Sequence, residues 1–270
     1  MASMQTFTLV TGASRGIGFH IARVAAAGGA DLILTARTEA ALEELAAELR
    51  TAHGGRIEVI ASDLGSPDGA RQLVREISAR GLQVGELVNN AGSGTMGGFV
   101  EQDPGGMEQM VQLNVTSLTL LSRLLLPGML ERGTGRIMNV ASLAGFGPGP
   151  TMAVYHATKA FVLSLSTALA RELCGTGVTV TCFCPGPTDD TGFDAVAGVE
   201  AGWLQRRTSL TAEQTARSAY RAMRAGRALA FPGSSVRVAA GISRMLPVGL
   251  SARLAHVSLR TSSPRNRPPA

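Results

Sequence analysis

Lysine, aromatic residues and long apolar runs are scarce in this chain. Of the 25 basic side chains only one is a lysine, Lys159, and the other 24 are arginines. Aromatic residues make up 4% of the 270 positions. No apolar run approaches the 18 or so residues of a membrane span, since the most apolar stretch (118–130) contains Arg123 and Pro127. The short polar start (1–7) predicts no signal peptide, so we expect a cytoplasmic protein.

Cysteine is limited to three residues, Cys174, Cys182 and Cys184. No histidine lies at a metal-ligand spacing from them, so we expect no metal site. Cys182 and Cys184 alternate along an apolar segment and would project to the same face of a strand. We interpret all three as reduced thiols in or near the core of a cytoplasmic protein.

Acidic residues end at Glu213. The segment 214–270 holds ten arginines and no Asp or Glu, so the remainder has 15 basic against 20 acidic side chains although the net charge of the chain is +5. Apolar residues near the end are spread among Arg, Ser and Gly, and Pro247 divides them into two short helical segments. We expect residues 234–270 to form a basic amphipathic extension, with a disordered Pro- and Arg-rich end at 261–270.

Short apolar segments alternate with longer helical patterns over residues 1–233, which we expect to form one domain. This alternation predicts an α/β fold, a doubly wound parallel sheet of about seven strands in a single domain. The expected strands are 7–11, 31–36, 56–61, 86–89, 136–141, 178–184 and 228–231. The expected helices are 17–27, a helix from residue 38, 67–80, 104–131, 152–174 and 211–225.

A glycine-rich turn directly follows the first expected strand, with the sequence Thr-Gly-Ala-Ser-Arg-Gly-Ile-Gly over residues 11–18. Glycine at such a turn permits positive φ and close approach of the backbone to a pyrophosphate, and the following helix presents free N–H groups. A purely structural tight turn is the alternative. The position before the first helix favours a dinucleotide site formed by Gly12, Ser14, Arg15, Gly16, Ile17 and Gly18.

The single lysine lies four residues after Tyr155, one of only two tyrosines. On a helix this spacing puts both side chains on one face. A neighbouring ammonium favours the phenolate and lowers the pKa of a tyrosine from about 10 toward neutrality. Tyr155 is therefore a candidate proton donor or acceptor. An isolated Tyr-x-x-x-Lys is more often a pair of surface neighbours, so the rest of the chain must decide.

Four further segments supply that context. They are Asn89-Asn90-Ala91-Gly92 after the fourth expected strand, Asn114 in the long helix, Ser142 after the fifth strand and Pro185-Gly186 after the sixth. With the spacing Gly-x-x-x-Gly-x-Gly, these residues resemble the short-chain dehydrogenase/reductase family over about residues 5–233. The resemblance implies that residues 1–233 are a dinucleotide-binding catalytic domain with a Rossmann-like fold. It also implies an oxidoreductase that transfers a hydride between a nicotinamide cofactor and a carbonyl or secondary alcohol.

The resemblance also implies a role for each of four residues. Tyr155 is the expected general acid in reduction, and Lys159 lowers its pKa and holds the nicotinamide ribose. Ser142 hydrogen-bonds the substrate carbonyl, and Asn114 fixes a water that relays protons to Lys159. Donors aimed at the carbonyl oxygen stabilise the negative charge that develops there. Taken singly, a strand-end serine and a buried helix asparagine are ordinary structural residues.

The cofactor preference depends on the end of the second strand, where NAD sites place an acidic residue. The sequence there is Thr35-Ala36-Arg37, so no carboxylate repels a 2′-phosphate and Arg37 can bind one bidentately. Arg15 is a second candidate, although both arginines can also be solvated surface residues. We therefore expect NADP(H) as the cofactor. The family resemblance implies further contacts to it from Asp63 at the adenine and from Asn90, Ala91, Gly92, Tyr155, Lys159, Pro185, Gly186 and Thr188.

The contact to the nicotinamide amide is ambiguous in the sequence. Members of the family often have a threonine after Pro-Gly, and here both Thr188 and Thr191 are candidates. The intervening Asp189 and Asp190 are unusual beside a cofactor.

Three segments are the expected walls of the substrate site: 93–99, 143–152 and 192–204, the last with Phe193 and Trp203. They are small or apolar and favour a lipophilic carbonyl or alcohol as the small-molecule substrate. The same residues can instead serve as packing beneath a lid.

Two other classes of function remain open. One is an NADP-binding sensor without turnover, against which the complete set of catalytic residues argues. The other is the same fold docked through its arginine-rich tail to an anionic membrane surface, a peripheral contact. The tail can instead pack over the body or a neighbouring subunit. We expect no nucleic acid partner, and the family resemblance implies a homo-oligomer, a dimer or tetramer formed through 104–131 and 152–174.

Overall fold

The main sheet of the protein is seven-stranded and parallel. The computed structural model describes residues 6–191 and 209–260. Its strand order is β3-β2-β1-β4-β5-β6-β9, and every neighbouring pair is parallel. These strands are β1 (Phe7–Thr11), β2 (Asp31–Thr35), β3 (Ile57–Val59), β4 (Val84–Asn89), β5 (Gly135–Val140), β6 (Val178–Phe183) and β9 (Leu229–Ala230). The predicted doubly wound α/β fold is confirmed.

Helices connect the strands, as the sequence pattern predicts. The α-helices are α1 (Gly16–Ala27), α2 (Glu39–His53), α3 (Gly69–Ala79), α4 (Pro104–Val111), α5 (Leu118–Glu131), α6 (Ala153–Glu172), α9 (Ala212–Arg224), α10 (Ser234–Met245) and α11 (Val248–Arg260). Shorter elements are the 3-10 turns η1 (Phe99–Glu101) and η3 (Leu143–Phe146), the π-helical turn η2 (Gln112–Ser117), and a small parallel pair, β7 (Thr188–Asp189) and β8 (Leu210–Thr211).

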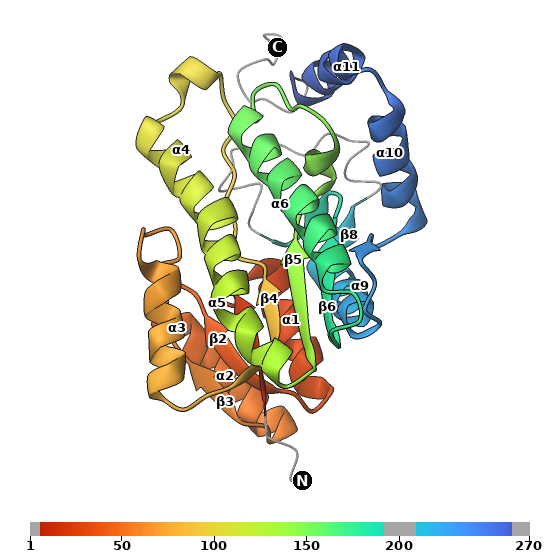
Figure 1. Ribbon diagram of the computed structural model, residues 1–270. Helices are drawn as coiled ribbons and strands as arrows, with labels where there is room; N and C mark the ends of the chain where they lie inside the picture. The colour runs from red at the N-terminus through yellow and green to blue at the C-terminus, as the bar shows by residue number, and fades with distance from the viewer. Residues whose placement is uncertain (1–5, 192–208, 261–270) are drawn as a thin grey trace.

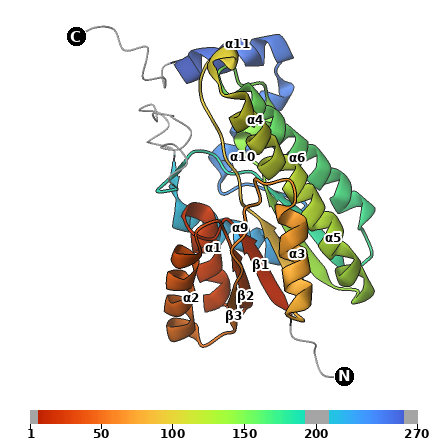
Figure 2. The same cartoon turned by 90° about the vertical axis from the view of Figure 1, so that its left-hand side faces the viewer.

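Helices cover both faces of the main sheet, with α1, α2 and α9 on one side and α3, α5 and α6 on the other (Figures 1 and 2). Consecutive residues of the central strands are therefore buried on opposite faces. Val10 and Leu34 pack toward α1 and α2, whereas Leu9 and Ile33 pack toward α3 and α5, and all four are fully buried. Continuous apolar strands of this kind belong to sheets that are covered on both faces.

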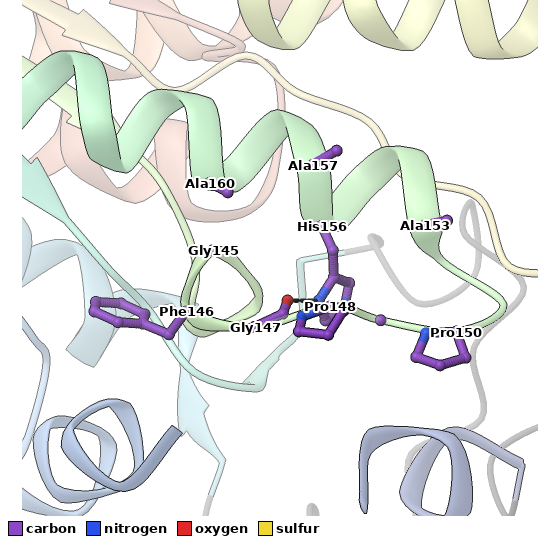
Figure 3. Close-up of a pocket in the computed structure, with 10 residues that line it drawn as sticks. Gly145, Phe146, Gly147, Pro148, Pro150, Ala153, His156, Ala157 and Ala160 are labelled. Atoms are coloured by element: carbon purple, nitrogen blue, oxygen red, sulfur yellow. Dashed lines mark hydrogen bonds between the residues drawn. The ribbon is translucent and has the colours of Figure 1, made fainter. Parts of the chain in front are cut away.

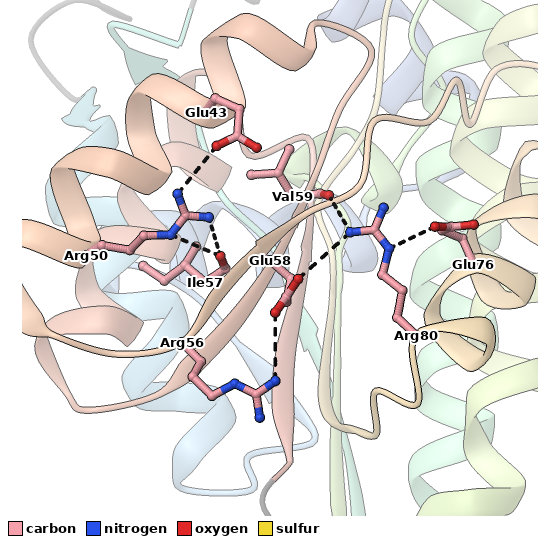
Figure 4. Close-up of polar contacts among 8 residues, drawn as sticks. All are labelled: Glu43, Arg50, Arg56, Ile57, Glu58, Val59, Glu76 and Arg80. Carbon is pink, nitrogen blue, oxygen red and sulfur yellow. Dashed lines mark hydrogen bonds and ion pairs between the residues drawn. The ribbon is translucent and has the colours of Figure 1, made fainter.

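The outer edge of β3 is protected by two arginines, one in α2 and one directly after α3 (Figure 4). Arg50 of α2 donates to the carbonyl oxygen of Ile57, and Arg80 donates to that of Val59 at 3.1 Å. These carbonyls lie on the side of β3 that has no neighbouring strand, so the guanidinium groups satisfy them and block pairing with another chain. The strand covers three residues instead of the predicted 56–61, because its ladder with β2 spans only three residue pairs.

The predicted helix at 104–131 is confirmed, with a π-helical turn at its middle. By length and composition alone, this is the one helix among the described residues that is apolar enough to cross a membrane. Its second half packs Leu121 and Met129 into the core against the sheet, and its π turn carries the buried Asn114. We therefore interpret the segment as a core helix of the domain.

The start of the basic extension folds as two helices, α10 and α11, as predicted. Val236 and Ala240 of α10 are buried, and α10 lies against η3. The predicted disorder at 261–270 concerns residues outside the described part of the chain. One expectation about the thiols is wrong: Cys174 is exposed, because α6 ends two residues earlier and the chain turns at the surface.

Candidate active site

The candidate site lies at the carboxyl ends of the parallel strands. The chain runs from β1 outward to β2 and β3, then returns to β4 on the other side of β1. In open α/β sheets, ligands bind at the carboxyl ends of the two strands where such a reversal occurs, which here are β1 and β4. The glycine-rich turn follows β1, and the Asn90-Ala91-Gly92 segment follows β4, so the fold places these two segments side by side.

The glycine-rich turn packs too closely on the β4 end to accept side chains. A methyl group on Gly18 would lie within 2.4 Å of both Asn90 Nδ2 and the Gly12 carbonyl oxygen. Gly12 and Gly16 also have positive φ, +67° and +61°. The Asn90 side chain donates to the Thr11 carbonyl oxygen at 2.9 Å and so ties the two segments together.

The beginning of α1 is suited to an anion. Arg15 occupies the cap position in extended conformation, its side chain makes no capping hydrogen bond, and the first turn contains no acidic residue. The first backbone N–H groups of the helix and its positive dipole end are therefore available to a phosphate group. With the close glycine contacts, these features fit the pyrophosphate of a dinucleotide, bordered by Ser14 and Ile17.

Arg37 follows β2 and is exposed, as is Arg15. Within the described residues neither arginine makes an ion pair. Asp63, the predicted adenine contact, is exposed after β3, and its carboxylate accepts a hydrogen bond from the Gly65 N–H at 2.9 Å. Arg15, Arg37 and Asp63 thus follow the carboxyl ends of β1, β2 and β3, which are neighbouring strands of the sheet.

Tyr155 and Lys159 lie one turn apart on α6. The Lys159 ammonium is 5.7 Å from the centre of the Tyr155 ring, and the lysine side chain is almost completely buried. Lys159 Nζ donates to the Val140 carbonyl oxygen at the end of β5, at 2.9 Å. The strand end therefore fixes the ammonium next to the phenol.

Burial lowers the pKa of Lys159 from 10.5 to about 8. Desolvation disfavours the charged form, and the nearby thiols Cys182 and Cys184 oppose that effect only in part. As predicted, these two thiols lie on the same side of the chain, Cys182 in β6 and Cys184 directly after it, with sulfurs 3.7 Å apart and no exposed surface. Lys159 is still mostly protonated at neutral pH, but its proton is much easier to remove than that of a surface lysine.

Asn114 is held in place by the loop after β4 and by α6. Its Nδ2 donates to the Ser93 carbonyl oxygen and to Thr158 Oγ1, at 2.9 and 3.0 Å, and its Oδ1 accepts from the Ser93 N–H at 3.0 Å. Both amide protons are therefore used, and one acceptor position remains on Oδ1. A methyl group on Gly92 would lie 3.2 Å from this Oδ1 and 3.5 Å from Lys159 Nζ, so the two polar atoms border one small space.

Ser142 follows β5 and begins η3, where its hydroxyl accepts a hydrogen bond from the Ala144 N–H at 3.1 Å. The hydroxyl proton remains available to another acceptor, such as a carbonyl oxygen. The next residue, Leu143, donates its N–H to the Pro185 carbonyl oxygen at 2.8 Å. The end of β5 is thereby joined to the Pro185-Gly186 segment after β6.

The two candidate threonines after Pro185-Gly186 lie in one short turn. Thr188 Oγ1 donates to the Gly186 carbonyl oxygen at 3.1 Å, and Thr191 Oγ1 donates to the Thr188 carbonyl oxygen at 3.4 Å. Asp189 accepts a hydrogen bond from the Ser209 hydroxyl, so its carboxylate links this turn to the chain before β8. The expected substrate wall at 192–204 lies outside the described residues.

A pocket of about 590 Å³ lies beside the candidate site, between η3, the loop after it and α6 (Figure 3). Its lining is mainly apolar and includes Phe146, Pro148, Pro150 and Ala160. His156 is the titratable group in this lining, and burial lowers its pKa. The neutral ring donates from Nδ1 to the Gly147 carbonyl oxygen at 2.8 Å.

Two residues that support the site were not singled out from the sequence. Thr11 Oγ1 accepts hydrogen bonds from the Asn90 and Ala91 N–H groups and donates to the Val88 carbonyl oxygen. Thr158 accepts from Asn114 and donates to the Tyr155 carbonyl oxygen at 2.7 Å. The sequence could have indicated both residues, since Thr11 is a polar residue at the end of an apolar strand and Thr158 directly precedes Lys159.

The strand order and the close-packed glycine-rich turn place this chain among the α/β proteins that bind dinucleotides. A family model of short chain dehydrogenases matches residues 6–199. Ketoacyl reductase HetN of Nostoc sp. is 35% identical over 193 residues, which are 72% of this chain and 67% of that protein. The chain belongs to the short-chain dehydrogenase/reductase family, whose members are oxidoreductases that use NAD(P)(H).

Two solved structures are similar over most of their length. A short-chain dehydrogenase from Sphingobium yanoikuyae in complex with NADPH is 33% identical, with a TM-score of 0.78, over 90% of this chain and 96% of the other. A bulky-bulky ketone specific alcohol dehydrogenase from Comamonas testosteroni is 27% identical, with a TM-score of 0.74, over 91% and 96%.

Proposed function

We propose that this protein is an NADPH-dependent reductase of a lipophilic ketone, which also oxidises the corresponding secondary alcohol with NADP⁺. The observation that carries the proposal is the buried ammonium of Lys159 next to Tyr155 at the carboxyl edge of the sheet. Burying a charge costs desolvation free energy, and ionisable groups with perturbed pKa values cluster at functional sites. Here the ammonium stabilises the phenolate that Tyr155 becomes when it gives up its proton.

The chain's own residues move the proton and orient the substrate. The bound cofactor supplies or accepts the hydride. Tyr155 donates its hydroxyl proton to the substrate oxygen during reduction, and Ser142 donates a hydrogen bond to the same oxygen. Lys159 favours loss of the Tyr155 proton. Asn114, with one free acceptor position next to Lys159 Nζ, orders the water through which that proton is replaced.

The preference for NADP(H) rests on the end of β2. That strand ends at the buried Thr35, and the chain continues with Ala36 and the exposed Arg37. A guanidinium that makes no ion pair with any described residue stands where a carboxylate would select a ribose hydroxyl, and Arg15 lies on the neighbouring turn. The related Sphingobium protein was solved with NADPH.

The lipophilic substrate class rests on the pocket beside η3 and on the relatives. Two prolines and Phe146 line that pocket, and its His156 is uncharged at neutral pH. Related proteins act on ketoacyl groups or on bulky ketones. A non-catalytic NADP sensor is the second candidate, and any steady turnover would exclude it. We further propose a cytoplasmic homo-oligomer that pairs through α4–α5 and α6, where Leu124 and Phe161 are partly exposed.

The test is an NADPH-oxidation assay against ketones of increasing size, from acetone to long-chain 3-oxoacyl thioesters and fused-ring ketones. We expect activity to rise with apolar size, and NADH to be a poorer donor than NADPH. If NADPH binds but no ketone is turned over, the alternative of a non-catalytic NADP-binding sensor is favoured instead.

A further inference from the structure

The outer face of α10 carries an unusual row of exposed apolar side chains. Val238, Ile242 and Met245 follow the spacing i, i+4, i+7 and so form one stripe along the helix. Their exposed fractions are 60%, 56% and 87%. The row continues onto α11 with Val248, Leu250 and Leu254, which are also exposed. We call these six residues the tail stripe.

The tail stripe does not result from loose packing of α10. Val236 and Ala240, on the opposite side of the same helix, are buried against the body. The Val236 side chain would contact a methyl group on Gly186 at 3.0 Å, so α10 is seated closely on the segment after β6. The helix is therefore apolar on two faces, of which one is buried against the domain and the other is exposed.

Positive charge flanks the tail stripe without any negative charge in the same segment. Arg237 and Arg244 lie beside it on α10, and Arg253 lies on α11; all three are exposed. None of them forms an ion pair with any described residue. From residue 214 to the end the sequence contains no Asp or Glu. Figures 1 and 2 show α11 at the opposite end of the molecule from α2 and α3.

We propose that the tail stripe docks on an anionic lipid bilayer, with its apolar residues inserted at the interface and the arginines at the phosphate groups. Apolar insertion combined with arginine flanks is the pattern of interfacial helices. A second copy of the chain is a poorer occupant, because a symmetric contact through this face would bring like charges together with no carboxylate between them. Nucleic acid would use the arginines and leave the apolar row in water.

The docking surface adjoins the pocket described above. Ser251 of α11 lies against Gly147, since a methyl group on that glycine would be 2.7 Å from Ser251 Oγ. Gly147 is part of the pocket wall. On the proposed function, a bilayer under α10 and α11 would bring lipophilic ketones next to the pocket that receives them. This consequence rests on the proposed function, whereas the docking itself does not.

The experiment is co-sedimentation of the full chain with vesicles. One set contains phosphatidylglycerol and phosphatidylcholine in equal parts, and the other contains phosphatidylcholine alone. We expect binding to the anionic set that weakens steeply with salt. Arg237→Gln/Arg244→Gln should lower the partition coefficient about 20-fold or more, since each arginine near an anionic surface contributes about fivefold. Ile242→Ser/Met245→Ser should lower it about tenfold or more.

Two controls separate docking from unspecific effects. Arg71→Gln/Arg75→Gln removes two exposed arginines from α3 and should leave vesicle binding unchanged. Ile242→Leu/Met245→Leu keeps the apolar surface and should retain binding. The proposal is overturned if anionic vesicles do not bind the chain, if the α3 variant loses as much as the α10 variant, or if the tail stripe mediates self-association or RNA binding instead. NADPH oxidation with a water-soluble ketone, measured on the same variants, reports on the proposed function separately.

Discussion

Asn114 Oδ1 and Lys159 Nζ face the same small space next to the α-carbon of Gly92. A methyl group at that α-carbon would lie 3.2 Å from the oxygen and 3.5 Å from the nitrogen. The π-helical turn of the long helix supplies one atom and α6 supplies the other. A side chain at residue 92 would therefore enter the space that both polar atoms border.

Gly92→Ala should therefore disturb proton supply without unfolding the protein. The methyl group requires a shift of only a few tenths of an ångström at Asn114, and the φ of Gly92 is not in the positive region. We expect kcat to fall on the order of 10²-fold, the usual cost of slight misplacement, and the melting temperature to change little. Steady-state kinetics and thermal unfolding check this. Wild-type kcat in Gly92→Ala would show that the space has no catalytic use.

Tyr155→Phe should lower kcat/KM by about 10²- to 10⁴-fold, because the substrate oxygen loses its proton donor. The phenyl ring can still pack, so the dissociation constant for NADPH should stay near that of the wild type. Fluorescence titration with NADPH and single-turnover kinetics measure the two effects separately. Near-normal turnover would remove Tyr155 from the role assigned to it.

Lys159→Arg should also be severely impaired although the charge is kept. The lysine occupies a buried slot and donates to the Val140 carbonyl oxygen. A planar guanidinium is larger and cannot reproduce a compact ammonium next to the phenol. We expect a large loss of kcat in NADPH oxidation, with Arg71→Lys as a surface control. If arginine substitutes without loss, a point charge at this position is not required.

Lys159→Met should be inactive but more stable than the wild type at neutral pH. Lowering the lysine pKa from 10.5 to about 8 corresponds to a folding cost of about 3 kcal/mol at neutral pH. The lost hydrogen bond to Val140 offsets about 1 kcal/mol of the gain, so the net gain should be about 2 kcal/mol.

The stability difference between Lys159→Met and the wild type should depend on pH. Between about pH 8 and pH 10.5 the unfolded chain binds the Lys159 proton and the folded chain does not, so the wild type gains stability as the pH rises. The advantage of Lys159→Met should therefore shrink over that range. Urea unfolding at several pH values measures it, and Tyr155→Phe, which keeps the lysine, is the control. A constant difference at all pH values would contradict the assigned origin.

Arg37→Ala should weaken NADPH binding and leave NADH binding nearly unchanged. Losing a charge-assisted hydrogen bond to the 2′-phosphate costs on the order of 1.5–3 kcal/mol, or about ten- to a hundredfold in affinity. Arg15 can also bind the 2′-phosphate, so we expect a loss at the low end of that range. The prediction is tested by measuring the dissociation constants of NADPH and NADH for the wild type, for this variant and for the control Arg75→Ala. An equal loss for both cofactors would make Arg37 structural.

Much of the fold was determined by the sequence alone. The alternation of apolar strands and amphipathic helices predicts a parallel sheet covered on both faces, and all seven strands of the main sheet overlap the predicted segments. β3 and β9 are shorter than predicted, and the small β7–β8 pair was not predicted. The glycine turn after β1 and the Tyr155–Lys159 pair follow from local geometry, since the positive φ of Gly12 and the spacing of four residues depend only on nearby chain.

Other features of the site were decided by tertiary structure. The low pKa of Lys159 results from burial beneath the end of β5, and the hydrogen bonds of Thr11 join residues 79 and 80 positions apart. The π turn around Asn114 and the seating of α10 on the Pro185-Gly186 segment likewise depend on contacts between distant parts of the chain. Periodicity describes which face of an element is apolar, but it does not say which neighbour covers that face. The outward stripe of α10 could therefore be recognised only once its inner face was seen to be occupied.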